Sequence, residues 1–199
     1  NLLVIISAPY SNLVDQWKQE LSKWYIDSNI LDAGWTKELR QEIQVSNKSI
    51  DKKLSVLICS HAKFARDEFL EIIKKSKIPV MLIVDEAHHV GAGNTGKDDD
   101  GVVVTNGSRK GLSEKYQYRL GLSATIERYF DQDGTDFIRN YFSGSSGKST
   151  VYTMSLKQAI EQDKLCRYNY YPYFVELTSD EFYEYKRLTK LAVSYLSSK

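Results

Sequence analysis

Cysteine and histidine are scarce in this chain of 199 residues, which has two cysteines and three histidines. Cys59 lies in an apolar run and Cys166 lies far along the chain, so the pair indicates neither a disulfide framework nor a Cys-x-x-Cys metal motif. The histidines have no cysteine near enough in sequence to complete a zinc pattern. These absences exclude the small disulfide-rich and zinc-finger classes, and we expect a reducing, cytoplasmic setting.

Long apolar runs and an excess of charge are also missing. No run approaches the ~20 residues that a membrane-spanning helix needs, so no membrane partner is expected. The formal net charge of +1 neither favours nor excludes a nucleic-acid partner, because a basic groove can coexist with an acidic remainder. The first residues lack the charged start and the cleavage site of a signal peptide. The chain opens inside an apolar run, and we expect it to be a piece of a longer protein.

Three short apolar runs are present, over residues 2–6, 54–59 and 80–84, and a fourth strand is predicted over residues 118–122. Continuous apolar runs of this length are typical of strands that are buried on both faces, as in a parallel sheet. Helical spacing of apolar residues follows the first run, and these residues are predicted to be core: Leu13, Trp17, Leu21 and Trp24. A more polar helix is predicted over residues 32–47. The pattern predicts an α/β fold with a parallel sheet flanked by helices.

Two acids, Asp85 and Glu86, come directly after the run at residues 80–84. Ligands of open parallel sheets bind at the carboxyl ends of the strands. An aspartate at that position can hold Mg²⁺ on a nucleotide, and a neighbouring glutamate can orient or deprotonate an attacking water. The pair therefore indicates nucleotide chemistry at this edge of the sheet.

The string that runs from Asp85 to His88 reads D-E-A-H and resembles the DEAH box, or motif II, of superfamily 2 helicases and translocases. Two more sequence segments resemble motifs of that family, and the three occur in the order that the family has. LLVIISAPYSNLVDQW, at residues 2–17, resembles motif Ia, and GLSAT, at residues 121–125, resembles motif III. The preceding YRLG narrows the resemblance to the branch of the restriction translocases of types I and III and the excision-repair helicases. Ile126 stands where that branch usually has proline.

The resemblance implies a RecA-like lobe of the P-loop NTPase type that uses ATP and Mg²⁺. It implies catalytic roles for Asp85, Glu86 and His88, with Asp85 holding the Mg²⁺. Motif III would couple the state of the ATP to nucleic-acid binding through Ser123, Ala124 and Thr125. Contacts with the nucleic acid are implied for the strand-end turn of motif Ia, at Ser7, Pro9 and Tyr10. A second contact, motif Ib of the family, is implied at the end of the strand over residues 54–59, where Ser60 fits loosely.

Two parts of that family are not found in the sequence, namely a P-loop before Asn1 and a second lobe after Lys199. The fold is therefore expected to be incomplete at the N-terminus, and the chain alone is expected not to hydrolyse ATP. The missing P-loop strand is expected between the strands that carry motifs II and III. GSSGKS, at residues 144–149, lacks the spacing of a phosphate-binding loop and is not expected to bind phosphate. Residues 1–150 are predicted to form the ATP-binding lobe, and residues 151–199 a segment that leads to the second lobe of the same polypeptide.

Three further predictions concern the less regular parts of the chain. Residues 91–111 are predicted to be a solvated loop, since the acidic run at 98–100 lacks the pattern of a calcium loop. Ser155 and Gln158 form a predicted capping box, and another cap is predicted at Thr178, before the last helix. Residues 168–177 are predicted to form an edge strand, whose aromatic side chains could alternatively stack on bases.

The function predicted from the motifs is part of an ATP-dependent helicase or translocase. The branch resemblance favours DNA over RNA as the polymer. The alternative is a catalytically inactive lobe that serves as a nucleic-acid-binding or scaffolding module. Polarity, and the choice between strand separation and translocation alone, stay open.

Overall fold

The computed structural model describes residues 1–51, 53–91, 93, 95–97, 103–105, 107–128, 131–143 and 152–197. The chain divides into two compact units, Asn1–Val151 and Tyr152–Lys199. Among the described helices, none combines the length and the apolar character that crossing a membrane would require. The acidic run at residues 98–100 and the GSSGKS segment lie outside the described residues.

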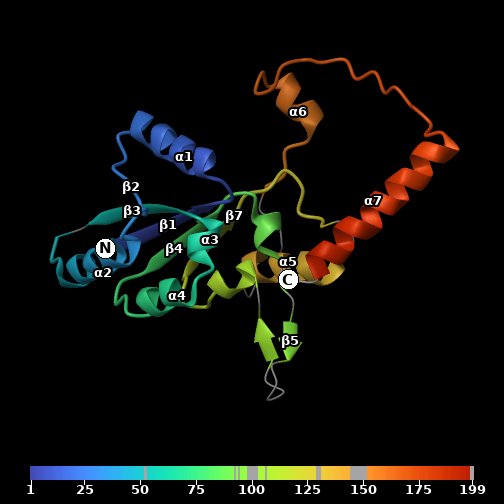
Figure 1. Cartoon of the computed structure of the whole chain (residues 1–199). Helices are drawn as coiled ribbons and strands as arrows, with labels where there is room; N and C mark the ends of the chain where they lie inside the picture. The colour runs from blue at the N-terminus through green and yellow to red at the C-terminus, as the bar shows by residue number, and fades with distance from the viewer. Residues whose placement is uncertain are drawn as a thin grey trace. The chain divides into compact units, whose positions relative to one another are not determined.

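The first unit is built on a five-stranded parallel sheet in the order β2-β3-β1-β4-β7 (Figure 1). The strands are β1 (Leu2–Ala8), β2 (Asn29–Ile30), β3 (Leu54–Ser60), β4 (Val80–Val84) and β7 (Tyr118–Gly121). The predicted α/β fold with a parallel sheet is confirmed, and so are the four predicted strands, now β1, β3, β4 and β7. β2 was not predicted, because two residues are too few to show a periodicity.

Helices cover both faces of this sheet. Figure 1 shows α1 on one side and α2 and α4 on the other. The helices of the unit are α1 (Ser11–Lys23), α2 (Trp35–Lys48), α3 (His61–Phe64), α4 (Asp67–Ile73) and α5 (Gln132–Ser143), with 3₁₀ turns η1 (Ala87–Gly91) and η2 (Ser108–Gly111). The predicted helix over 32–47 begins at Trp35, after a glycine in the left-handed region.

Alternate strand residues point into two separate cores. One core contains Leu3, Ile5 and Leu82 together with buried residues of α2 and α4. The other lies under α1, where Leu13, Trp17 and Leu21 pack as partly buried residues against it. The prediction that Trp24 belongs to the core is wrong, because Trp24 follows the end of α1 and is 76% exposed.

The strands of motifs II and III lie side by side. β4 pairs directly with β7, with Ile83 opposite Leu120 and Val84 opposite Gly121. The prediction that a P-loop strand lies between them is therefore wrong. In the sheet formed by the described residues, β7 is an edge strand, and its Tyr118 and Leu120 are exposed.

Residues 91–111 are more ordered in part than predicted. They include a short antiparallel pair, β5 (Thr95–Lys97) and β6 (Val103–Thr105), and they end in η2. Arg109 of η2 is buried, where its Nε donates to the backbone oxygen of Gly91 at 2.6 Å. Its guanidinium also lies 4.5 Å from the centre of the Phe137 ring. A buried arginine ties this segment to α5, which a composition rich in glycine and serine does not reveal.

Gly111 is expected to tolerate no side chain. A Cβ there would lie 2.3 Å from a ring carbon of Phe64 and 2.7 Å from the Phe64 backbone oxygen. Overpacking of this kind costs about 1–3 kcal/mol, so Gly111→Ala should lower the free energy of unfolding by that amount. Urea denaturation measures the change, with Ser108→Ala in the same 3₁₀ turn as the control. Equal stability of the two variants would contradict this packing.

The second unit contains α6 (Leu156–Glu161) and α7 (Ser179–Ser197). The predicted capping box is confirmed, with the Ser155 side chain accepting from the backbone of Gln158 and the reverse bond also present. The hydroxyl of Thr178 likewise accepts from the Glu181 backbone before α7. The predicted edge strand over 168–177 is wrong, because this segment forms no strand. Its aromatic run lacks the partner strand that a ladder of backbone hydrogen bonds needs.

Candidate functional site

The carboxyl ends of β1, β4 and β7 bring the motif residues together. Asp85 follows β4, and its backbone N–H donates to the backbone oxygen of Ser7 at 2.8 Å. The half-buried Asp85 carboxylate accepts two hydrogen bonds at 2.9 Å. Oδ1 accepts from the Glu86 backbone N–H, and Oδ2 accepts from the indole Nε1 of Trp17.

Glu86 occupies an unusual backbone conformation, with φ at +46°. Non-glycine residues in this left-handed region are uncommon, and they cluster at functional sites, where surrounding structure holds the strain. The turn directs the half-buried Glu86 side chain to His88, whose Nδ1 lies 3.3 Å from Glu86 Oε2. The two acids of the motif therefore face different partners.

His88 joins motif II to motif III. Its Nδ1 lies 2.9 Å from the hydroxyl of Ser123, and that hydroxyl also donates to the Thr125 backbone oxygen at 2.6 Å. Since the one hydroxyl hydrogen of Ser123 is used on Thr125, and the Glu86 carboxylate is an acceptor, Nδ1 of His88 carries the proton. Burial, followed by the positive charge of His89, lowers the pKa of His88, which favours its neutral form.

The motif III turn is exposed at Ser123, Ala124 and Thr125. Ile126, which stands in the place of proline, packs against the first core. The turn is therefore anchored by an apolar contact while its hydroxyl groups stay at the surface. The core contact of Ile126 depends on the tertiary fold, so the sequence shows this residue only as a departure from the motif.

Arg128 is a site residue that the sequence analysis missed. Its Nη1 donates to the His88 backbone oxygen, and its Nε donates to Asp131 at 2.7 Å. Its own backbone N–H donates to the hydroxyl of Thr135 in α5. Arg128 therefore clamps the 3₁₀ turn that follows the two acids. A lone arginine outside any motif gives no sequence signal for this role.

The residues predicted to contact nucleic acid differ in their exposure. Tyr10 is 59% exposed, and the centres of its ring and of the His89 ring lie 6.2 Å apart in an edge-to-face arrangement. Pro9 beside it is half-buried, as is Ser60, whose hydroxyl accepts from the Lys63 backbone at 3.4 Å and caps α3. The structure thus leaves Tyr10 available to a ligand and gives the Ser60 hydroxyl a capping role.

Ser7 is fully buried, and its hydroxyl lies 2.7 Å from Nδ1 of His61. The hydroxyl is therefore not exposed at the surface of the described structure, and the predicted nucleic-acid contact through Ser7 stays a prediction. Burial lowers the pKa of His61 to about 4, and the charge of His89 adds to this effect. Nε2 of His61 is buried without a partner in the described part of the chain.

The donor set around Asp85 fits Mg²⁺ on a nucleotide. No group of three or more acidic, histidine or cysteine side chains gathers to hold a metal anywhere in the described ranges. Mg²⁺ needs no such cage, since proteins bind it through one or two carboxylates together with substrate phosphates and waters. A carboxylate oxygen accepts about two bonds, so each oxygen of Asp85 keeps one free lone pair.

Comparison with known proteins gave one family. A family model described as the type III restriction enzyme, res subunit, matches residues 2–128. No curated protein matched. A solved structure of a de novo designed protein with a P-loop NTPase fold covers 73% of this chain and 93% of its own, at 17% identity and a TM-score of 0.37. A similarity that low supports no inference about function.

Proposed function

Since the chain belongs to the family of the type III restriction enzyme res subunit, a family of helicase superfamily 2, we propose that it is the first motor lobe of an ATP-dependent DNA translocase or helicase. At the coarser level, family membership makes it a helicase-like module of superfamily 2. Hydrolysis of ATP, movement on DNA and cooperation with a second lobe of the same polypeptide are parts of the proposal.

The observation that carries the proposal is the position of the DEAH segment between the two other motif segments. Tyr10 of the motif Ia turn touches His89, and Ser123 of motif III is bonded to His88. A structural change at Asp85 or Glu86 can therefore be passed through His88 to motif III and through His89 to motif Ia. This arrangement supports coupling between nucleotide hydrolysis and nucleic-acid binding.

In the proposed reaction each acid has a separate role. Asp85 holds Mg²⁺, and Glu86 accepts a proton from the attacking water or orients it. When bound, ATP would supply the phosphoryl group, and Mg²⁺ held by Asp85 would neutralise the negative charge on it. Nδ1 of His88 faces both the Glu86 carboxylate and the Ser123 hydroxyl, and Tyr10 offers a ring to the nucleic acid.

The proposal is tested by measuring ATP hydrolysis of the intact protein with and without double-stranded DNA, single-stranded DNA and RNA. We expect DNA to stimulate hydrolysis and Asp85→Ala to abolish it. Nucleic-acid binding without any hydrolysis would instead support the inactive scaffolding module. Stimulation by RNA alone would overturn the choice of polymer.

The hydroxyl groups of motif III are expected to serve coupling and not chemistry. Replacing Ser123 and Thr125 together by alanine should leave basal hydrolysis near that of the wild type and reduce DNA stimulation roughly tenfold, since coupling free energies are typically about 1–3 kcal/mol. Steady-state hydrolysis assays with and without DNA measure both quantities. Ser22→Ala on α1 serves as the matched control, and equal losses in both rates would place the two hydroxyl groups in the chemical step.

A further inference from the structure

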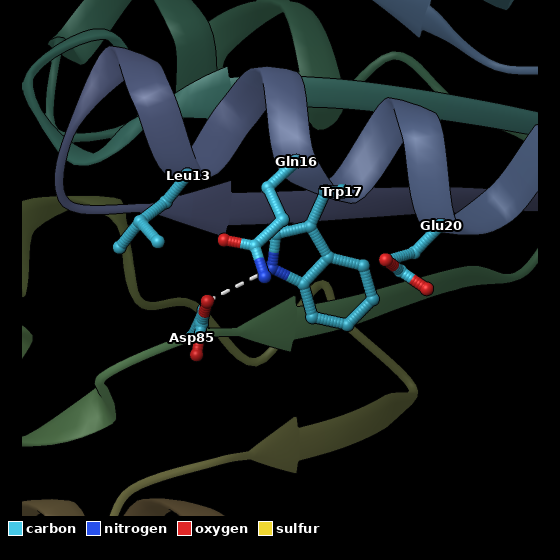
Figure 2. A pocket seen from close by; sticks show the side chains of 5 residues that line it. All are labelled: Leu13, Gln16, Trp17, Glu20 and Asp85. Atoms are coloured by element: carbon cyan, nitrogen blue, oxygen red, sulfur yellow. Dashed lines mark hydrogen bonds between the residues drawn. The ribbon is translucent and has the colours of Figure 1, made fainter.

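The side chain of Trp17, on helix α1, contacts Asp85, the first acid of motif II. Trp17 donates from Nε1 to Oδ2 of Asp85 at 2.9 Å, across 68 residues of sequence (Figure 2). Four residues from one face of α1 line a hollow of about 300 Å³ beside that carboxylate, namely Leu13, Gln16, Trp17 and Glu20. Figure 2 shows the indole extending from α1 with Nε1 directed at Asp85.

Two donors from different directions fix the orientation of the Asp85 carboxylate. The Glu86 backbone N–H holds Oδ1 and the Trp17 indole holds Oδ2. Without the second donor, the carboxylate could rotate about its side-chain bonds, and that freedom would have to be lost again when it binds a ligand. The bond is charge-assisted, which makes it about twice as strong as a neutral one.

Packing alone does not explain the position of Trp17. Its ring borders the core under α1, and the ring of a phenylalanine could fill the same kind of space. The indole N–H instead donates to the carboxylate of Asp85, which directly follows strand β4. The same helix touches the motif II segment a second time at its start, where Tyr10 meets His89.

We propose that Trp17 is a positioning residue for Asp85, and that its N–H holds the carboxylate in the orientation that binds the divalent metal of the nucleotide. This inference rests on the proposed function, in which Asp85 holds Mg²⁺. Loss of the N–H weakens metal binding while the affinity for metal-free nucleotide stays the same.

The test is a titration of the intact protein with Mn²⁺ in the presence of a non-hydrolysable ATP analogue, followed by electron paramagnetic resonance. Trp17→Phe keeps a ring and removes the donor, and we expect it to weaken Mn²⁺ binding about tenfold, the scale of one hydrogen bond to a charged group. Trp24→Phe is the matched control, since Trp24 lies just beyond the same helix with an exposed ring, and it should bind Mn²⁺ like the wild type.

A second variant separates positioning from packing. In Trp17→His, Nε2 of the five-membered ring falls near the place of the indole Nε1, so this variant should recover part of the lost Mn²⁺ affinity. Thermal unfolding of all variants reports the packing role independently. A lowered melting temperature with unchanged Mn²⁺ affinity would show that Trp17 is only an anchor for α1, and it would overturn the inference.

The two levels of the proposal fail differently. If the wild-type protein binds no Mn²⁺ with the ATP analogue, the proposed function fails, and the role of Trp17 fails with it. If the wild type binds Mn²⁺ and Trp17→Phe matches Trp24→Phe, only the inference about Trp17 fails. Tighter binding by Trp17→Phe would also overturn it, because the indole would then be holding Asp85 away from the metal.

Discussion

Glu86→Gln in the intact protein should lower the turnover of ATP by about 100-fold or more while nucleotide binding stays close to that of the wild type. Glutamine has nearly the same shape as glutamate but cannot accept a proton, and general-base catalysis contributes about 10²–10⁴-fold. The half-buried side chain already lies beside His88, so the change removes a base without creating a cavity. Single-turnover hydrolysis together with equilibrium binding of nucleotide measures the two effects separately.

A matched control for this variant is Glu71→Gln, which removes an exposed carboxylate paired with Lys74 on α4. The control should hydrolyse ATP like the wild type. Turnover of Glu86→Gln within twofold of the wild type would remove Glu86 from the proposed chemistry. Loss of nucleotide binding in Glu86→Gln would instead indicate that the strained turn at this residue had collapsed.

The second large effect is expected on stability, as the pH falls from about 6.5 to 4. Burial lowers the pKa of His61 to about 4 in the folded chain, whereas an unfolded histidine titrates near pH 6.5. Between these values the unfolded chain holds more protons, so acidification favours unfolding, and this contribution to stability is fully present only above pH 6.5. This difference in the pKa of His61 corresponds to a loss of about 3 kcal/mol in the free energy of unfolding.

Urea denaturation of the chain at pH 7 and at pH 4.5 measures this loss. The control is His61→Asn, which keeps a polar atom near Ser7 but has no ionisable ring, and it should lose less stability over the same interval. A residual slope is expected, because the pKa of His88 is also lowered and acts in the same direction. Identical slopes for the wild type and His61→Asn would contradict the buried, neutral state of His61.

Much of the fold was predictable, because the apolar strands carry a strong local signal. The run from Val80 to Val84 needs no tertiary information to be recognised as a buried strand, and the acids after it mark its carboxyl end. The order of the strands in the sheet could not be predicted in the same way. Direct pairing of β4 with β7 depends on contacts between residues that are more than 30 positions apart, and no local pattern encodes that neighbour.

The candidate site divides in the same way. The sequence alone identified Asp85, Glu86, His88 and Ser123 as candidate site residues, since each belongs to a motif. It did not identify the roles of Trp17, Arg128 or His61, because their partners come from other elements and their spacing resembles ordinary core or surface patterns. Trp17 was predicted to be a core residue for this reason, and only its contact with Asp85 reveals its polar function.

The sequence by itself determined the class of fold, the position of the two acids and the family resemblance, because these depend on residue type and short-range order. Tertiary structure alone decided which of the predicted contacts are accessible. Ser7 and Tyr10 lie three residues apart, yet one is fully buried against His61 and the other is exposed beside His89. The physical reason is that burial and hydrogen bonding are set by neighbours in space, and at a sheet edge these neighbours come from several distant segments.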